Sequence, residues 1–145
     1  MRRATVVLTL AVLAASVLPT GAALASAPCR GWRFDADASG LGSRREQLRN
    51  RRVVRCTFGR VAPAQVDEAV AVARCESGLD DEAYNGDSGA SGLFQHLRRY
   101  WPSRARALPS PPFGRRPSAF SSQANAWAAA KMVRASGWGA WSCSP

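Results

Sequence analysis

The chain has 145 residues, with 20 Lys and Arg against 10 Asp and Glu, so its formal net charge is +10 at pH 7. This length fits one domain around one hydrophobic core and argues against several domains. The excess of positive charge favours polyanionic partners, and the alternative is a solvated basic face without a partner.

Residues 1–25 have the layout of a secretory signal peptide. A basic start precedes an apolar run from Ala4 to Leu18, Pro19 closes that run, and small residues lead to a cleavage site after Ala25. A membrane anchor is the alternative, but the run is shorter than the ~20 residues that a spanning helix needs. Cleavage would shorten the chain from 145 to 120 residues and, because two arginines leave, lower its net charge from +10 to +8. We therefore expect a secreted protein without a membrane span, for which anionic wall polymers and membrane surfaces are candidate partners and nucleic acid is not.

The four cysteines are Cys29, Cys56, Cys75 and Cys143. An even number in an exported chain predicts two disulfides, and the spacing alone leaves all three possible pairings open. A zinc site is not expected, because no two cysteines form a C-x-x-C pair and His96 is the only histidine. No metal or other cofactor is implied.

Residues 26–60 are polar and rich in arginine, and we expect them to form a basic extension outside the folded domain. Val53 and Val54 are among its few apolar positions and offer little core. A short helix is expected from Ser43 to Asn50, because its first residue can cap it and Glu46 follows three residues later, as in a capping box. The extension would serve either electrostatic attachment or solubility alone.

The folded domain is expected to span residues 61–145 and to begin with a helix from Pro63 to Glu76. Proline suits a first helical turn, and two acidic residues follow near the positive end of the helix dipole. Apolar residues at three- and four-residue steps predict one buried face, formed by Val66, Ala69, Val70 and Ala73. Glu76 follows Ala69 by seven residues and lies within roughly 20° of that face, so its carboxyl is expected to be poorly solvated.

Glu76 is the candidate general acid of this chain. Burial disfavours the ionised form, which predicts that Glu76 stays protonated near neutral pH and can donate its proton to a leaving group. Residues 77–92 are rich in Gly, Ser, Asp and Asn, which form turns rather than core, and we expect them to form one wall of a cleft. The alternative is that Glu76 simply ends a helix at the surface.

A second helix is expected from Gly92 to Trp101, because apolar residues recur there at helical steps. Pro102 would stop this helix. His96 would lie partly exposed on it, without a catalytic role.

Residues 103–118 contain four prolines and predict a loop without regular structure. A final helix is expected from Phe120 to Ser136, with Phe120 on its buried side, Ser118 or Ser121 as its cap and Gly137 at its end. Three tryptophans are expected in the core rather than on a sugar-binding surface: Trp127, Trp138 and Trp141.

The stretch from Arg74 to Gln95 contains Glu76-Ser77-Gly78-Leu79, then Ala83 and Asn85, then Ser88 to Gln95. These residues and their spacing resemble the signature of lytic transglycosylases and goose-type lysozymes, which share a lysozyme-like fold. Phe94 stands where many members carry Met, which keeps an apolar residue. Cys75 before the acid, with a late Trp and Cys, is similar to the secreted actinobacterial branch that includes the resuscitation-promoting factors. The resemblance covers roughly residues 63–143 and does not include residues 26–60.

The resemblance implies a mainly α, lysozyme-like domain (α+β in class) with a turn-rich cleft loop and two disulfides. In the related secreted enzymes the Cys before the acid bonds a late Cys. This implies the pair Cys75–Cys143 and leaves Cys29–Cys56 as the second pair.

The resemblance also implies cleavage of the β-1,4 bond between N-acetylmuramic acid and N-acetylglucosamine in peptidoglycan. Glu76 would act first as acid and then as base, giving a 1,6-anhydro end. The candidate substrate-binding residues are Ser77, Tyr84, Asn85 and Gln95. We expect a monomer whose partner is the peptidoglycan glycan strand.

Two other kinds of function remain open. A hydrolytic muramidase would need a second carboxylate, for which the nearby candidates are Asp80, Asp81 and Asp87. A cationic protein that binds the cell wall, or disrupts membranes, without catalysis would need only the positive charge.

Overall fold

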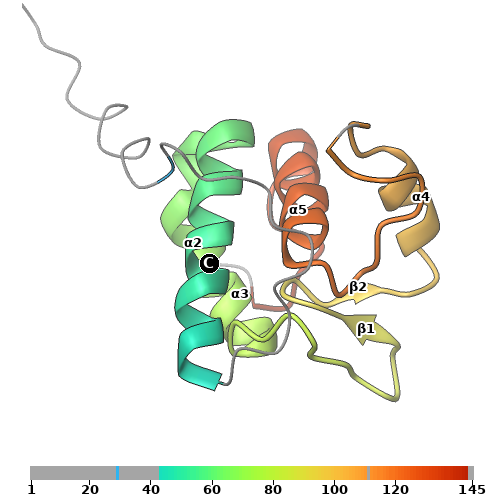
Figure 1. Cartoon of the computed structure of the whole chain (residues 1–145), viewed down its shortest axis with the longest axis horizontal. Helices are drawn as coiled ribbons and strands as arrows, with labels where there is room; N and C mark the ends of the chain where they lie inside the picture. Colours follow the sequence, from blue (N-terminus) through green and yellow to red (C-terminus); the bar gives the residue numbers. More distant parts are fainter. Residues whose placement is uncertain (1–28, 30–42, 111, 144–145) are drawn as a thin grey trace, which may run out of the picture.

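The computed structural model describes residue 29 and residues 43–110 and 112–143. These residues form one small, mainly helical domain with a two-stranded sheet, which confirms the predicted helical class. The elements in chain order are α2 (Ser43–Val61), the 3₁₀-helix η2 (Pro63–Gln65), α3 (Val66–Ser77), β1 (Ala90–Ser91), β2 (His96–Leu97), α4 (Trp101–Arg106) and α5 (Ser122–Ser136). Figure 1 shows α2 beside α5, with α4 and the β-hairpin on the other side of α5. The predicted signal peptide and most of residues 26–42 lie outside the described residues.

Helix α2 corrects the expectation of a basic extension that ends at residue 60. The helix continues well past Asn50 to Val61, and it packs against both α5 and α3. Val53, Val54 and Phe58 are almost fully buried in the main core. The arginines lie largely on the other sides of the helix, so their charge conceals an apolar stripe in the sequence. Residues 43–60 therefore belong to the folded domain, because α2 is one wall of its core.

Helix α3 is the part of the fold that carries Glu76, and its predicted buried face is confirmed. Val66, Ala69, Val70 and Ala73 are all buried. The helix ends at Gly78, whose left-handed backbone (φ 66°) suits glycine. The Gly78 N–H donates to the carbonyl of Arg74 at 2.9 Å, which satisfies the helix end two residues after Glu76.

The helix expected from Gly92 to Trp101 is wrong, because the chain forms a hairpin there. Strands β1 and β2 pair antiparallel, with Ala90 opposite Leu97 and Ser91 opposite His96. Leu93 and Phe94 lie in the connecting turn and are completely buried. A short hairpin turn folded into the core buries apolar residues at spacings that also suit a helix. Pro102 lies in the first turn of α4 and does not end a helix.

Gly92 is required in the hairpin turn for two reasons. Its φ of 74° is in the left-handed region, which residues with a side chain rarely adopt. A Cβ atom there would also collide with the carbonyl oxygen of Ala119 and the side-chain amide of Asn125. The Asn125 amide is buried and connects three segments, since Oδ1 accepts from the Phe94 N–H at 2.8 Å and Nδ2 donates to the carbonyls of Ser91 and Ala119.

Helix α5 is close to the sequence prediction and forms the centre of the domain. Ser121 caps it by accepting from the Ala124 N–H at 3.4 Å, and Gly137 ends it with a φ of 71°. The alanines of α5 are nearly all buried, so neighbouring helices can approach closely. Trp138 and Trp141 pack on the core as expected, whereas Trp127 is half-buried in a second apolar cluster with Phe113. None of the helices in the described ranges is both long and apolar enough to cross a membrane.

Candidate active site

Glu76 lies in the last turn of α3. Its side chain is half-buried, and its Oε1 accepts a hydrogen bond from the backbone N–H of Cys143 at 3.2 Å. Among the described residues, no other hydrogen bond or ion pair reaches this carboxyl group. One oxygen is therefore held by the protein, and within that part of the chain the other is available to a bound molecule.

A disulfide places the donor of this hydrogen bond. Cys75 is bonded to Cys143 across a sequence separation of 68, and Cys29 to Cys56 across a separation of 27. Both predicted pairings are confirmed. Because Cys75 directly precedes Glu76, the bond holds the backbone of Cys143 beside the candidate acid.

Ser77 connects the end of α3 to the hairpin turn. Its Oγ lies 3.0 Å from the carbonyl oxygens of both Ala73 and Leu93. A hydroxyl has one proton to donate, so these two acceptors share it. The proton is thus engaged within the protein, which makes positioning of the hairpin the observed role of Ser77.

Tyr84 and Asn85 lie in the loop between Glu76 and the hairpin. The Asn85 Oδ1 accepts from the N–H groups of Asp87 and Ser88, both at 3.0 Å, which closes a tight polar turn. Tyr84 forms an isolated β-bridge with Ser91 and leaves 55% of its surface exposed. Tyr84 therefore presents an aromatic face to solvent, whereas the Asn85 side chain stabilises its own turn.

Gln95 ends the hairpin turn with a left-handed φ of 45°. Its Nε2 donates to the carbonyls of Gly92 at 2.9 Å and Ala83 at 3.2 Å. The amide thereby joins the turn to the loop that carries Tyr84. The structure brings Gln95 and Tyr84 to one region and connects Glu76 to it through Ser77.

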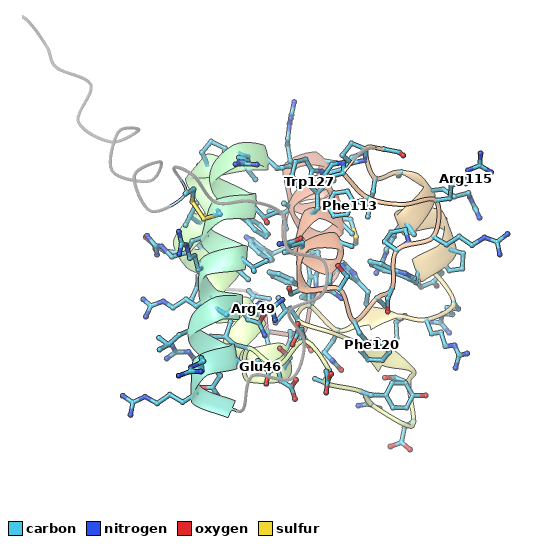
Figure 2. All side chains as sticks on the ribbon, in the orientation of Figure 1. Glu46, Arg49, Phe113, Arg115, Phe120 and Trp127 are labelled. Atoms are coloured by element: carbon cyan, nitrogen blue, oxygen red, sulfur yellow. A yellow bond between two sulfur atoms is a disulfide. The ribbon has the colours of Figure 1, made fainter. Side chains whose placement is uncertain are left out.

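A pocket of about 420 Å³ lies between the hairpin, α4 and the segment that enters α5. Tyr84, Trp101 and Phe120 contribute aromatic surface to it, and Arg98 contributes a positive charge. Phe120 was expected on the buried side of a helix, but it precedes the cap of α5 and is 41% exposed (Figure 2). The sequence signal for this was its place before Ser121, since a residue before a helix cap does not share the helix face.

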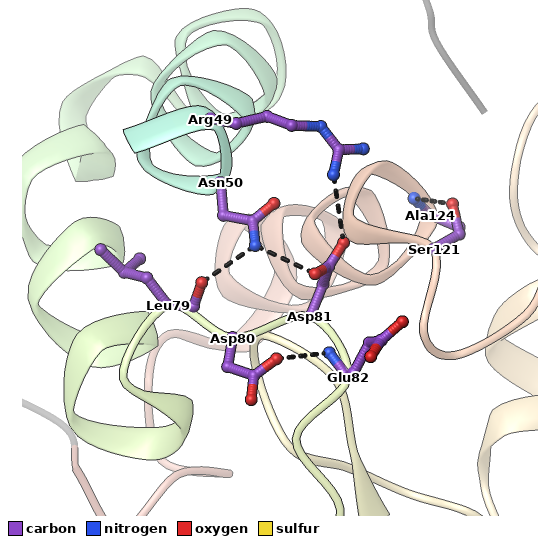
Figure 3. Close-up of polar contacts among 8 residues, drawn as sticks. All are labelled: Arg49, Asn50, Leu79, Asp80, Asp81, Glu82, Ser121 and Ala124. Atoms are coloured by element: carbon purple, nitrogen blue, oxygen red, sulfur yellow. Dashed lines mark hydrogen bonds and ion pairs between the residues drawn. The ribbon is translucent and has the colours of Figure 1, made fainter. Parts of the chain in front are cut away.

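A cluster of acidic side chains lies between α2 and the loop after Glu76, and Figure 3 shows how Arg49 and Asn50 of α2 contact its member Asp81. Asp81 is buried, accepts from the Asn50 Nδ2 at 3.1 Å and pairs with Arg49 at 3.6 Å. The cluster also contains Glu46 and Asp80, and carboxylate oxygens of these three acids lie within 4.8 Å of one another. That spacing would allow a cation to bind, although the sequence implied no metal. The Asn50 and Arg49 contacts already satisfy Asp81, so the cluster has a structural explanation.

His96 is buried in β2, which corrects the expectation of a partly exposed helix residue. Its Nε2 lies 3.0 Å from the carbonyl of Asn125, and its Nδ1 lies 2.6 Å from an Arg104 guanidinium nitrogen. A carbonyl only accepts and a guanidinium only donates, so the ring carries its proton on Nε2. Burial and the charge of Arg104 lower the pKa of His96 to about 3, and the ring is neutral and structural.

Comparison of the chain with protein-family models, with curated proteins and with solved structures finds no significant match. The assignment of a function therefore depends on the residues of the chain and on their arrangement.

Proposed function

We propose that the chain is a secreted lytic transglycosylase that cleaves the bond between N-acetylmuramic acid and N-acetylglucosamine in peptidoglycan. The observation that carries this proposal is the environment of Glu76. Its carboxyl group is half-buried at a helix end and has one oxygen held by the Cys143 N–H and no second partner among the described residues. A group in such a position can exchange a proton with a substrate and keep its orientation. The two disulfides are compatible with an oxidising compartment.

In the proposed reaction Glu76 first gives its proton to the glycosidic oxygen, and the bond from that oxygen to the muramic C1 breaks. The C6 hydroxyl of the same muramic residue then attacks C1 and returns its proton to Glu76. The products are a free hydroxyl on the leaving sugar and a 1,6-anhydro ring, and no water is consumed. Glu76 ends the cycle protonated, as it began.

The aromatic pocket supports a sugar chain as the substrate. Tyr84 and Phe120 are two of the few large apolar side chains with much of their surface exposed among the described residues, and both line this pocket. Sugar rings stack with their C–H faces on aromatic rings, which offsets the cost of exposing such residues. Ser77 bonds the hairpin turn to the end of α3, and Gln95 bonds that turn to the loop that carries Tyr84.

Of the three acids that could assist a hydrolytic muramidase, Asp81 is disfavoured by its position, whereas Asp80 and Asp87 are exposed and the products must decide. A hydrolase would need a second carboxylate beside the scissile bond to activate water or to act as nucleophile. Asp81 is 2% exposed and tied to Asn50 and Arg49, so it is poorly placed to reach a sugar. Asp80 accepts from the Glu82 N–H at 2.8 Å, an ordinary turn contact.

The test is Glu76→Gln, which keeps the shape of the side chain but cannot exchange a proton. We expect cleavage of purified peptidoglycan to fall at least ~10²–10⁴-fold, the usual contribution of general acid–base catalysis. Glu82→Gln removes an exposed acid of the adjacent loop and should remain active. Mass spectrometry of the wild-type digest should show anhydro-muropeptides, lighter by one water than hydrolytic products. Only reducing ends would indicate a muramidase, and binding without cleavage would indicate an adhesion protein.

A further inference from the structure

Two adjoining pockets lie on the side of the domain where α2 and α5 end. One has a volume of about 540 Å³ and extends from Arg60 to Gln65 at the start of α3, and the other has about 430 Å³ and reaches Trp127 and Pro109. Arg60, Val61 and Arg134 line both, so the two pockets are halves of one groove. We call it the basic groove.

Every charged residue that lines the basic groove is positive, namely Arg60, Lys131 and Arg134. Neither Arg60 nor Arg134 has a hydrogen bond or ion pair with another described residue. The Lys131 ammonium donates to the carbonyl of Ala107 at 2.6 Å, which keeps it over the groove. Three like charges are therefore gathered without a neutralising acid in the lining.

Apolar side chains contribute to the floor between these cations, namely those of Val61, Val133 and Trp127. Trp127 belongs to α5 and packs against Phe113 of the proline-rich loop (Figure 2). A low-polarity floor strengthens the attraction of the cations for an anion that enters the groove. A small anion would meet only part of this surface, whereas a chain with repeated charges would meet all three cations.

The basic groove is separate from the candidate active site. Gln65 lines the groove at one end of α3, and Glu76 lies at the other end of this 12-residue helix. At 1.5 Å per residue the two ends are about 17 Å apart. The last residues of α2 line the groove, and this end of α2 is the upper one in Figure 1, away from the hairpin.

We propose that the basic groove binds a phosphodiester-linked polyanion of the polyol-phosphate kind. Guanidinium groups form paired hydrogen bonds with phosphate oxygens, and the groove has two that no described residue occupies. The apolar floor suits the carbon backbone between phosphates. This inference depends on the groove and not on the proposed cleavage reaction, so either can fail without the other.

The test measures binding of the full chain to poly(glycerol phosphate) by calorimetry at two salt concentrations. Arg60→Gln/Arg134→Gln should weaken binding at least about tenfold and make its salt dependence shallower. The matched control is Arg44→Gln/Arg45→Gln, which removes the same charge about 22 Å away at the other end of α2 and should change affinity less than about twofold. Circular dichroism would verify that both variants are folded.

Three outcomes decide the proposal. Equal weakening by the two double variants would overturn it, because binding would then follow overall charge. Equal affinity for a carboxylate polymer of the same length, polyglutamate, would overturn the phosphodiester assignment. Retention of glycan cleavage by Arg60→Gln/Arg134→Gln, together with loss of polymer binding, would support the groove as a site of its own.

Discussion

Glu46 and Asp81 form a contact between two acids that ties α2 to the loop after Glu76. The pKa of Glu46 is raised from 4.5 to about 7. The largest cause is the hydrogen bond of Glu46 with Asp81, followed by its partial burial and by the negative charges of Asp81, Asp80 and Glu82. Below that pH Glu46 keeps a proton that it can share with Asp81. Above it Glu46 is charged beside the other acids, and among the described residues Arg49 and Asn50 contact Asp81 and offset the repulsion.

This contact predicts a stability that falls as the pH rises. The pKa of Glu46 is higher in the fold than its ordinary value, so its contribution is complete below pH 4.5 and is lost on the way to about pH 7. Glu46→Gln keeps a neutral donor towards Asp81 and should flatten this part of the profile. Urea denaturation midpoints at several pH values would measure how stability depends on pH, with Glu68→Gln as the control. The same slope in Glu46→Gln and wild type would contradict the prediction.

The hairpin of β1 and β2 is the element on which the candidate site depends most. It brings Tyr84, through its bridge to Ser91, beside the aromatic pocket, and its turn accepts the Ser77 hydroxyl. The turn is anchored to α5 by Asn125, which approaches Gly92 closely. The hairpin is consequently held by side chains of α3 and α5 as well as by its own short ladder.

Gly92→Ala should therefore disrupt the hairpin severely. The substitution combines a left-handed φ with a collision against backbone and a buried amide, which predicts a loss of at least about 2 kcal/mol in the free energy of unfolding. Gly89→Ala is the matched control, because Gly89 also has a positive φ, of 70°, but its Cβ would meet only Arg98 at an ordinary 3.5 Å. Urea denaturation should show a markedly larger loss in the free energy of unfolding for Gly92→Ala than for Gly89→Ala. Equal losses would mean that the positive φ, and not the collision, accounts for the cost.

The elements that could be predicted are those whose local signals agree. Helices α3 and α5 combine an apolar face with a glycine at the end, and in α5 with a serine cap. The hairpin could not be predicted, because its buried turn residues Leu93 and Phe94 recur at helical steps with Leu97, Tyr100 and Trp101. For α2 the signal was present, since Val53, Val54 and Phe58 recur at helical steps, but the surrounding arginines obscured it.

In the candidate site, the place of Glu76 at the end of a helix with a buried face could be predicted from the sequence, and the disulfide pairs from its resemblance. The hydrogen bond from Cys143 to Glu76 could not, because it joins residues 67 positions apart and depends on the path of the tail. Phe120 was misplaced because it lies one residue before the cap of α5. The first contact is defined only by the assembled domain, whereas the exposure of Phe120 follows from the choice of Ser121 as the cap.

At the scale of the whole molecule, the two disulfides have different predicted effects. The chain-entropy model gives a loss of about 4 kcal/mol in the free energy of unfolding for removal of either pair, slightly more for the longer loop of Cys75–Cys143. Only the Cys75→Ala/Cys143→Ala variant should also lose glycan cleavage when it is still folded, because the N–H donor leaves Glu76. Cys29→Ala/Cys56→Ala, assayed at the same low temperature, should retain it. Equal activities would show that the contact of Cys143 with Glu76 does not contribute to cleavage.

The tail contact has a consequence for where the proposed enzyme becomes active. If Glu76 acquires its hydrogen-bond donor only when Cys75 and Cys143 are oxidised, Glu76 in a reduced chain inside the producing cell lacks the Cys143 N–H that orients it. Export into an oxidising compartment would then activate the proposed enzyme, because formation of the disulfide orients Glu76. The comparison of the two cysteine variants tests this as well, because a folded chain without the 75–143 bond isolates the effect of that bond on Glu76.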